Sequence, residues 1–223
     1  MVECKQNLYD YENIDYEKDI KAKNGQFILK RIMDFIIASV GIVILLPIYL
    51  AIVIAIKIDS KGPAVFKQVR AGKDNEPFTI YKFRTMIVNA ERKQTLEIEE
   101  SSLENFVFQS TSDNRITKVG KFLRETSLDE LPQLFNVLMG EMSLVGPRPE
   151  IPEVVKYYPD TYAQRLMVLP GITGLAQISG RGEIELGKTI YFDLKYIKNF
   201  SVIEDIKILF GTVVSVFKKE GAM

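Results

Sequence analysis

An uncharged, apolar run of 22 residues, Phe35–Ile56, constrains the fold of this chain more than any other feature. A straight helix of that length would extend roughly 33 Å, about the thickness of the hydrocarbon core of a bilayer. Pro47 lies just past the middle of the run, where a proline removes a backbone donor and bends or breaks a helix. The run therefore predicts a membrane helix that is bent or broken at Pro47.

Positively charged residues flank this run at both ends. They are Lys30 and Arg31 before it, and Lys57, Lys61, Lys67 and Arg70 after it. Because positive charge marks the cytoplasmic side of a membrane segment, both ends are assigned to the cytoplasm. Two arms of about 11 residues, each reaching roughly half the bilayer, would dip in and return. On these residues alone three interpretations stay open: a re-entrant helix–break–helix, a spanning helix, and the buried core helix of a soluble protein.

The composition narrows the chemistry that the chain can perform. It has no histidine, which excludes Ser–His and Cys–His nucleophiles and histidine-ligated zinc. Its single cysteine, Cys4, excludes an internal disulfide. Lys+Arg and Asp+Glu both number 29, and a net charge of zero argues against general nucleic-acid binding. A reactive site must use carboxylates, Lys, Arg, Tyr, backbone groups or a hard cation.

Asp129 and Glu130 stand side by side in the stretch Ser127–Pro149. Ser127 and Glu130 have the spacing of a capping box, although Pro132 leaves open which residue is the cap. The apolar residues that follow predict a helix ending at Gly140. A helix dipole at that start would keep Asp129 ionised, ready to act as a nucleophile or metal ligand. Adjacent acids are common at helix starts, so a merely structural role is the alternative.

Arg148 lies between Pro147 and Pro149 at the end of the same stretch. The two prolines hold its backbone extended, which lowers the entropic cost of presenting the guanidinium to a phosphate. The alternative is an ordinary stiff loop.

Two short segments upstream, Ala64–Val69 and Pro77–Arg84, predict the strands of a β-hairpin, because turn residues separate them. Alternation along the second strand puts Lys82 and Arg84 on one face. These side chains could clamp a phosphate or simply be solvated.

The remaining segments are mostly helical in pattern. Residues Asn89–Gln109 read as a Glu-rich insertion with a solvated face, and Arg115–Thr126 as a basic amphipathic helix suited to anionic headgroups or a phosphate. The glycine-rich stretch Leu169–Gly182 lacks dinucleotide-binding and Walker spacing but could bring backbone amides and Arg181 to a ligand. Val202–Phe217 has the broad apolar face of a core helix or an in-plane membrane helix.

Several of these motifs occur together in one known family. From about Lys30 to the C-terminus, the chain resembles the bacterial sugar transferases that are monotopic polyprenol-phosphate phosphoglycosyl transferases. The motifs that carry the resemblance are Lys30-Arg31, Tyr81–Met86, Ser127–Pro149 almost throughout, Pro170–Gly174 with Gln177, and Gly180-Arg181.

The resemblance implies a transfer of sugar-1-phosphate from a UDP-sugar to undecaprenyl phosphate, with release of UMP. Asp129 would be the nucleophile, Glu130 its partner, and Mg²⁺ would bind beside Asp129. The cations near the substrates would be Lys82, Arg84, Arg148 and Arg181 on the donor phosphates, with Lys30 and Arg31 near the lipid phosphate. Such proteins start the assembly of exopolysaccharide, capsule, O-antigen or glycoprotein glycans at the cytoplasmic face of the bacterial inner membrane. Membrane lipids would be further partners, and a homo-oligomer is compatible with the sequence.

The resemblance also implies a fold. The expected class is α/β but mainly helical, with a re-entrant membrane helix–break–helix and a small cytosolic catalytic domain containing a short β-hairpin and interfacial amphipathic helices. The expected boundaries are 1–29 for an N-terminal extension without assigned chemistry, 30–60 for the membrane helix and 61–223 for the catalytic domain.

Two other classes of function remain as alternatives. A membrane-bound, metal-dependent phosphohydrolase would use the same groups but pass the phosphosugar to water. A non-catalytic membrane scaffold would keep the apolar segment and need neither carboxylate.

Overall fold

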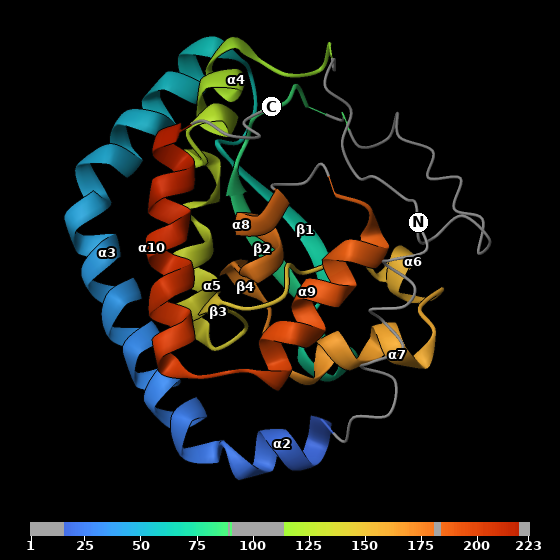
Figure 1. The fold of residues 1–223 in the computed structure, drawn as a ribbon. Coiled ribbons are helices and arrows are strands. Elements are labelled where there is room, and N and C mark those ends of the chain that lie inside the picture. Colours follow the sequence, from blue (N-terminus) through green and yellow to red (C-terminus); the bar gives the residue numbers. More distant parts are fainter. Residues whose placement is uncertain (1–15, 89, 91–113, 181–183, 219–223) are drawn as a thin grey trace.

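The computed structural model describes residues 16–88, 90, 114–180 and 184–218 (Figure 1). Helices dominate this part of the chain, which confirms the mainly helical class. They are α2 (Tyr16–Ala22), α3 (Asn24–Asp59), α4 (Lys118–Glu125), α5 (Gln133–Met139), α6 (Pro152–Val155), α7 (Asp160–Ala163), α8 (Leu175–Gly180), α9 (Leu186–Lys198) and α10 (Val202–Lys218), with short 3₁₀ turns η1 (Lys73–Asn75), η4 (Leu128–Glu130) and η5 (Gln164–Met167). The expected Glu-rich insertion lies almost wholly outside the described residues.

The membrane segment forms one long helix, α3, which begins at Asn24, within the expected N-terminal extension. Its 36 residues run past Pro47 without interruption, so the helix is not broken at the proline as expected. Leu45 and Tyr49, on either side of Pro47, both pack on buried apolar clusters of the molecule. These contacts hold both arms, and α3 curves around the other elements instead of ending at the proline (Figure 1).

Contacts between α3 and the rest of the molecule extend along its whole length. Near its start, the Asp34 carboxylate accepts hydrogen bonds from the Ser143 hydroxyl and the Leu144 N–H. Near its end, the Asp59 carboxylate accepts one from the Val119 N–H at 3.0 Å. Both ends of α3 therefore lie against the same body of the protein.

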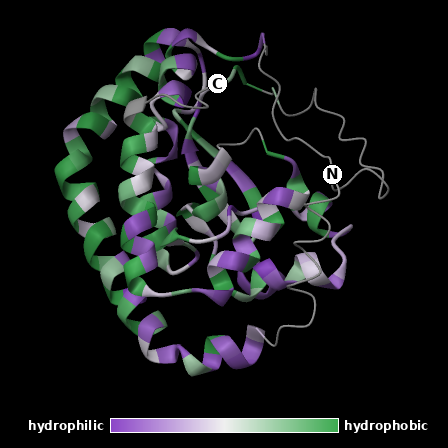
Figure 2. Cartoon of the chain, in the orientation of Figure 1, coloured by the Kyte–Doolittle hydropathy of each residue, from purple (hydrophilic) through white to green (hydrophobic). Residues whose placement is uncertain are grey.

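The opposite side of α3 is apolar and exposed (Figure 2). In the described part of the chain, α3 is the one helix that is long and apolar enough to cross a membrane. Helix α10 lies beside it and adds exposed apolar side chains of its own (Figure 1). The most exposed members of this apolar face, which combines α3 and α10, are Val43, Ile44, Leu46, Leu50, Ile58, Ile203 and Phe210.

The expected hairpin is confirmed, with β1 (Val65–Ala71) antiparallel to β2 (Pro77–Phe83). The turn η1 between them uses positive φ angles at Asp74 and Asn75, which these side chains tolerate better than most. Phe78, Ile80 and Phe83 of β2 are buried. The hairpin is therefore anchored in the core through β2, beside helix α5.

A second, smaller sheet was not expected. Strand β3 (Ser143–Val145) pairs in parallel with β4 (Gly171–Thr173). Gly146 and Gly171 allow the two backbone segments to pass close to each other, because a Cβ on Gly171 would lie 2.1 Å from the Gly146 nitrogen. This crossing directly precedes Arg148 and fixes where the proline-flanked segment leaves the core.

Candidate functional site

The Asp129–Glu130 pair lies in the single 3₁₀ turn η4, ahead of helix α5. The expected capping box at Ser127 is wrong: Ser127 has a left-handed backbone (φ 54°), and its side chain caps no helix. Pro132 occupies the N-cap position of α5, so the helix starts too late to include the two acids in its first turn. The predicted stop at Gly140 is confirmed, with φ 88° at the C-cap.

Glu130 is held by two cations on a single carboxylate oxygen. Lys82 Nζ donates to Glu130 Oε1 over 2.8 Å, and Arg148 Nη2 donates to the same oxygen over 3.0 Å. The Lys82 and Glu130 side chains are each 18% exposed, so these ion pairs are largely shielded from water. Three residues that the sequence marked separately are thus brought together, from β2, η4 and the loop after β3.

Within the described part of the chain, no hydrogen bond or ion pair engages the Asp129 carboxylate. Burial, followed by the neighbouring charge of Glu130, raises the pKa of Asp129 to about 6, against the opposing charges of Lys82, Arg148 and Arg124. The dipole argument predicted the opposite direction. It fails because Asp129 lies in the single turn η4, ahead of the first turn of α5 in which the argument placed it.

Glu130 shifts the other way. Burial would raise its pKa, but the charges of Arg148 and Lys82 and their hydrogen bonds outweigh burial and lower the pKa to about 2. The two adjacent carboxylates therefore differ in state. Glu130 stays ionised and is paired with two cations, whereas Asp129 has no ion pair in the described chain and ionises near neutral pH.

Three residues that the sequence did not single out as site residues complete the surroundings; the third of them, Arg124, belongs to the predicted basic helix. Asn136, fully buried on α5, accepts from the Tyr81 N–H and donates to Thr79 O, so α5 is locked to the strand that carries Lys82. Tyr49 of α3 donates to the Leu131 carbonyl, directly after Glu130. A polar Asn inside the apolar stretch of α5 was a signal for such a buried contact. The Tyr49 contact spans 82 positions and leaves no local signal.

Arg124, the third, lies on the basic helix α4. Its Nε donates to the Thr85 hydroxyl at 3.0 Å, and its charge opposes the rise in the pKa of Asp129. The amphipathic helix expected there is confirmed over Lys118–Glu125.

Arg84 does not join the carboxylates. Its Nη2 donates to the Ser60 carbonyl and hydroxyl oxygens, both at 2.8 Å, beside the end of α3. Arg84 is 6% exposed and joins the hairpin to α3. Arg181 lies outside the described residues.

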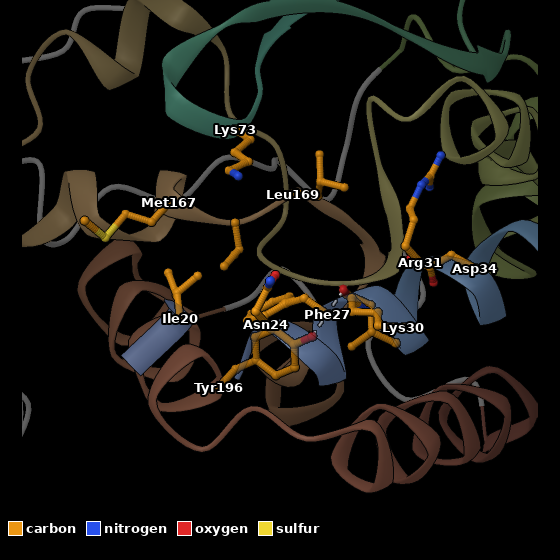
Figure 3. Close-up of a pocket in the computed structure, with 12 residues that line it drawn as sticks. Ile20, Asn24, Phe27, Lys30, Arg31, Asp34, Lys73, Met167, Leu169 and Tyr196 are labelled. Carbon is orange, nitrogen blue, oxygen red and sulfur yellow. Dashed lines mark hydrogen bonds between the residues drawn. The ribbon is translucent and has the colours of Figure 1, made fainter. Parts of the chain in front are cut away.

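Lys30 and Arg31 lie at the other end of α3 (Figure 3). Lys30 is buried, and its Nζ donates to the Asp205 carboxylate over 2.7 Å. Both residues line a cavity of about 250 Å³ that Lys73 and Tyr196 also line. Tyr49, which contacts Leu131 beside the carboxylates, lies nineteen helical steps from Lys30, roughly 28 Å. The structure therefore does not bring these cations to Asp129.

The donor set suits a magnesium ion only if substrate shares in binding it. The described residues contain no group of three or more acidic or cysteine side chains able to hold a metal by themselves. Mg²⁺ commonly uses one or two carboxylates together with water and substrate phosphates. Asp129 offers such a carboxylate, whereas Glu130 is neutralised by Lys82 and Arg148.

Comparison with known protein families gives one match over almost the whole chain. The family described as bacterial sugar transferase matches residues 25–219.

Individual relatives are similar over the same region. A UDP-glucose:undecaprenyl-phosphate glucose-1-phosphate transferase of Klebsiella pneumoniae is 46% identical, over 89% of this chain and 42% of the relative. An undecaprenyl-phosphate galactose phosphotransferase of Salmonella typhimurium is 40% identical, over 90% of this chain and 43% of the relative. The chain thus spans less than half the length of these two. An uncharacterized sugar transferase of Bacillus subtilis is 42% identical, over 87% of this chain and 90% of the relative.

Proposed function

The chain belongs to the bacterial sugar transferase family, and from that premise we propose that it transfers a sugar-1-phosphate from a UDP-sugar to undecaprenyl phosphate and releases UMP. The observation that carries the proposal is the unequal carboxylate pair. In the described chain the Asp129 carboxylate has no hydrogen bond or ion pair, while Glu130, next to it, forms ion pairs with Lys82 and Arg148. The names of the Klebsiella and Salmonella relatives both give undecaprenyl phosphate, and the Klebsiella name also gives a UDP-sugar.

In the first step, an ionised Asp129 oxygen attacks the phosphorus that carries the sugar. A bond forms between the carboxylate oxygen and phosphorus, the bond from phosphorus to the bridging oxygen of the diphosphate breaks, and UMP leaves with that electron pair. The product is a phosphosugar–aspartate. The bond between sugar C1 and oxygen is untouched, so the anomeric configuration persists.

In the second step, a phosphate oxygen of undecaprenyl phosphate attacks the same phosphorus. The bond to Asp129 breaks, the carboxylate is regenerated, and the diphosphate-linked sugar leaves on the lipid. Two half-reactions that share one covalent intermediate give ping-pong kinetics.

Lys82 and Arg148 stabilise the negative charge that develops on the transferred phosphoryl group. Both already face Glu130, which holds them in place without neutralising them fully, since two cations share one carboxylate. Fixed charges of this kind need no reorganisation during the reaction, which is the main source of their effect on rate.

Asp129, together with the donor diphosphate, would hold Mg²⁺, which supplies charge neutralisation for the departing UMP. We expect a chelator such as EDTA to stop UMP release and added MgCl₂ to restore it. Release that continues at an unchanged rate in excess EDTA would contradict the metal assignment.

The membrane lies against the apolar face of α3 and α10, with the catalytic domain on the cytoplasmic side of the inner membrane. Support comes from α3 itself, whose two ends both contact the domain. A helix that carried one end across a bilayer would lose one of these sets of contacts. The re-entrant, monotopic arrangement keeps both. In this position the enzyme would start the assembly of a cell-surface polysaccharide or glycan on its lipid carrier.

The test measures UMP release from a panel of UDP-sugars, with and without undecaprenyl phosphate, in detergent or nanodiscs. The proposal predicts sustained release only when the lipid acceptor is present, and none from the Asp129→Asn variant. Sustained release without acceptor, with free sugar phosphate as product, would instead identify a phosphohydrolase. If no UMP were released from any donor, the result would favour the alternative of a non-catalytic membrane scaffold.

A further inference from the structure

The backbone that carries Arg148 is held at every carbonyl oxygen from Pro147 to Glu150. Two of the donors are backbone N–H groups and two are arginine side chains. The pairs are Gly171 N with Pro147 O (2.8 Å), Arg165 Nη2 with Arg148 O (2.9 Å), Arg70 Nη1 with Pro149 O (3.2 Å) and Ala71 N with Glu150 O (2.8 Å). The prolines at 147 and 149 have no N–H, so this segment depends on its carbonyl oxygens for backbone anchoring.

The donor at the centre, Arg165, is 1% exposed and uses all three of its nitrogens. Its Nε and Nη2 lie 2.8 and 2.7 Å from Asp193 Oδ2. Its Nη1 donates to the Tyr158 hydroxyl over 2.9 Å and lies 3.5 Å from Glu150 Oε1. Asp193 and Glu150 are themselves buried, at 1% and 5% exposure.

A buried ion cluster of this kind needs an explanation beyond stability. Removing ions from water is costly, and apolar side chains of similar size often serve a core as well or better. A guanidinium, however, can bind a carboxylate and a carbonyl at once in a fixed plane, which neither an apolar side chain nor a lysine can do. Arg165 does this between Asp193 on α9 and the carbonyl of Arg148.

We propose that Arg165, oriented by Asp193, is a positioning residue for Arg148. It fixes the Arg148 backbone so that the Arg148 guanidinium reaches Glu130 and remains directed at the transferred phosphoryl group. Arg165 touches no substrate. This inference rests on the proposed function, because it assigns Arg148 to the phosphoryl group.

The first variant is Arg165→Lys, which keeps the charge but cannot serve Asp193 and the Arg148 carbonyl in one plane. Since misplacing a charged group by about 1 Å can slow a reaction roughly 100-fold, we expect kcat to fall about 10- to 100-fold. The KM for the UDP-sugar should change less than about threefold. Ile190→Val, in the core of α9 one turn before Asp193, is the control for a general loss of stability. Its kcat should stay within about twofold of wild type.

A double-mutant cycle separates positioning from structure. In an Arg148→Ala background, Arg165→Lys should slow single-turnover UMP release by less than about threefold, because the cationic side chain that Arg165 positions is already gone. The same loss factor in both backgrounds would overturn the proposal. So would an unchanged rate in the wild-type background.

A second readout does not depend on catalysis. The Nε–H resonance of Arg148, identified by its loss in Arg148→Lys, should be sharp in the wild type. It should broaden in Arg165→Lys and, as a milder alternative should that variant not fold, in Asp193→Asn. An unchanged resonance in a folded variant would overturn the positioning role. If the wild type released no UMP from any donor, the proposed function would fail while this measurement would still decide whether Arg165 orders Arg148.

Discussion

At the scale of single residues, the central feature is the contrast between two neighbouring carboxylates. Glu130 has a lowered pKa because Arg148 and Lys82 outweigh its burial, while burial and the Glu130 charge raise the pKa of Asp129. A nucleophilic carboxylate must be ionised, and one that is poorly stabilised by partners is the more reactive. Under the proposed mechanism the two acids have separate roles: Glu130 holds the two cations in place, and Asp129 reacts.

This contrast predicts the pH dependence of the reaction. In the proposed mechanism Asp129 acts only without its proton, and burial raises its pKa to about 6. We therefore expect kcat/KM to fall about tenfold per pH unit below that value and to level off above it. Glu130, with a pKa of about 2, stays ionised across the whole range and adds no second limb. The check is the initial rate of UMP release between pH 4.5 and 8 at low donor concentration. A flat profile, or a midpoint near 4, would contradict the raised pKa.

Sequence patterns singled out residues that lie together in the candidate site, but they did not predict the geometry. The sequence singled out Asp129, Glu130, Lys82 and Arg148. The last three are joined by ion pairs, and Asp129 stands next to Glu130 without an ion pair of its own in the described chain. The wrong cap at Ser127 arose because Pro132 delays the start of α5. Lys30 and Arg84 look like exposed cations in the sequence, yet tertiary contacts turn them to Asp205 and Ser60. Such pairings join distant positions and have no local signature.

At the scale of elements, the close crossing of β3 and β4 places the Arg148 segment. These strands have three residues each, too short for the alternation that marked the hairpin, so the sequence did not predict them. The sequence placed Gly171 in the glycine-rich stretch Leu169–Gly182, which could bring backbone amides to a ligand. In the structure Gly171 instead packs against the backbone of Gly146.

A substitution at this crossing should be severe. In Gly171→Ala the new methyl group would lie 2.1 Å from the Gly146 nitrogen and 2.4 Å from the Thr173 oxygen, which are backbone atoms that cannot step aside. We expect a loss of at least about 3 kcal/mol in unfolding free energy. Gly25→Ala is the matched control, since its Cβ would meet nothing within 4 Å. Thermal unfolding in detergent compares them, and equal shifts in Tm for both variants would refute the packing role.

At the scale of the whole molecule, helix α3 joins the site to the apolar face. Its inner side carries Asp34 and Tyr49, which contact β3 and the turn after Glu130, and its outer side is exposed and apolar. The sequence predicted a membrane segment here but not its packing side, because apolar residues surround the helix axis. Only the contacts with the folded domain distinguish the two sides.

Membrane binding should therefore depend on the outer side of α3 and on α10 together. Val43 and Phe210 are 73% and 71% exposed, so replacing both by lysine removes apolar contact without disturbing the core. At about 1.5–3 kcal/mol for each buried apolar side chain, the double variant should bind lipid vesicles at least about tenfold more weakly. Glu76→Lys, in the exposed hairpin turn, adds a charge elsewhere and should float with vesicles like the wild type. Equal flotation of all three proteins would place the membrane contact on another face.

The covalent step tests the account most directly. Protein treated with the correct UDP-sugar in the absence of undecaprenyl phosphate should gain the mass of one sugar phosphate. Fragmentation should place that mass on Asp129, and adding the lipid should remove it. Product that accumulates while intact-mass and peptide spectra show no adduct on Asp129 would contradict the mechanism.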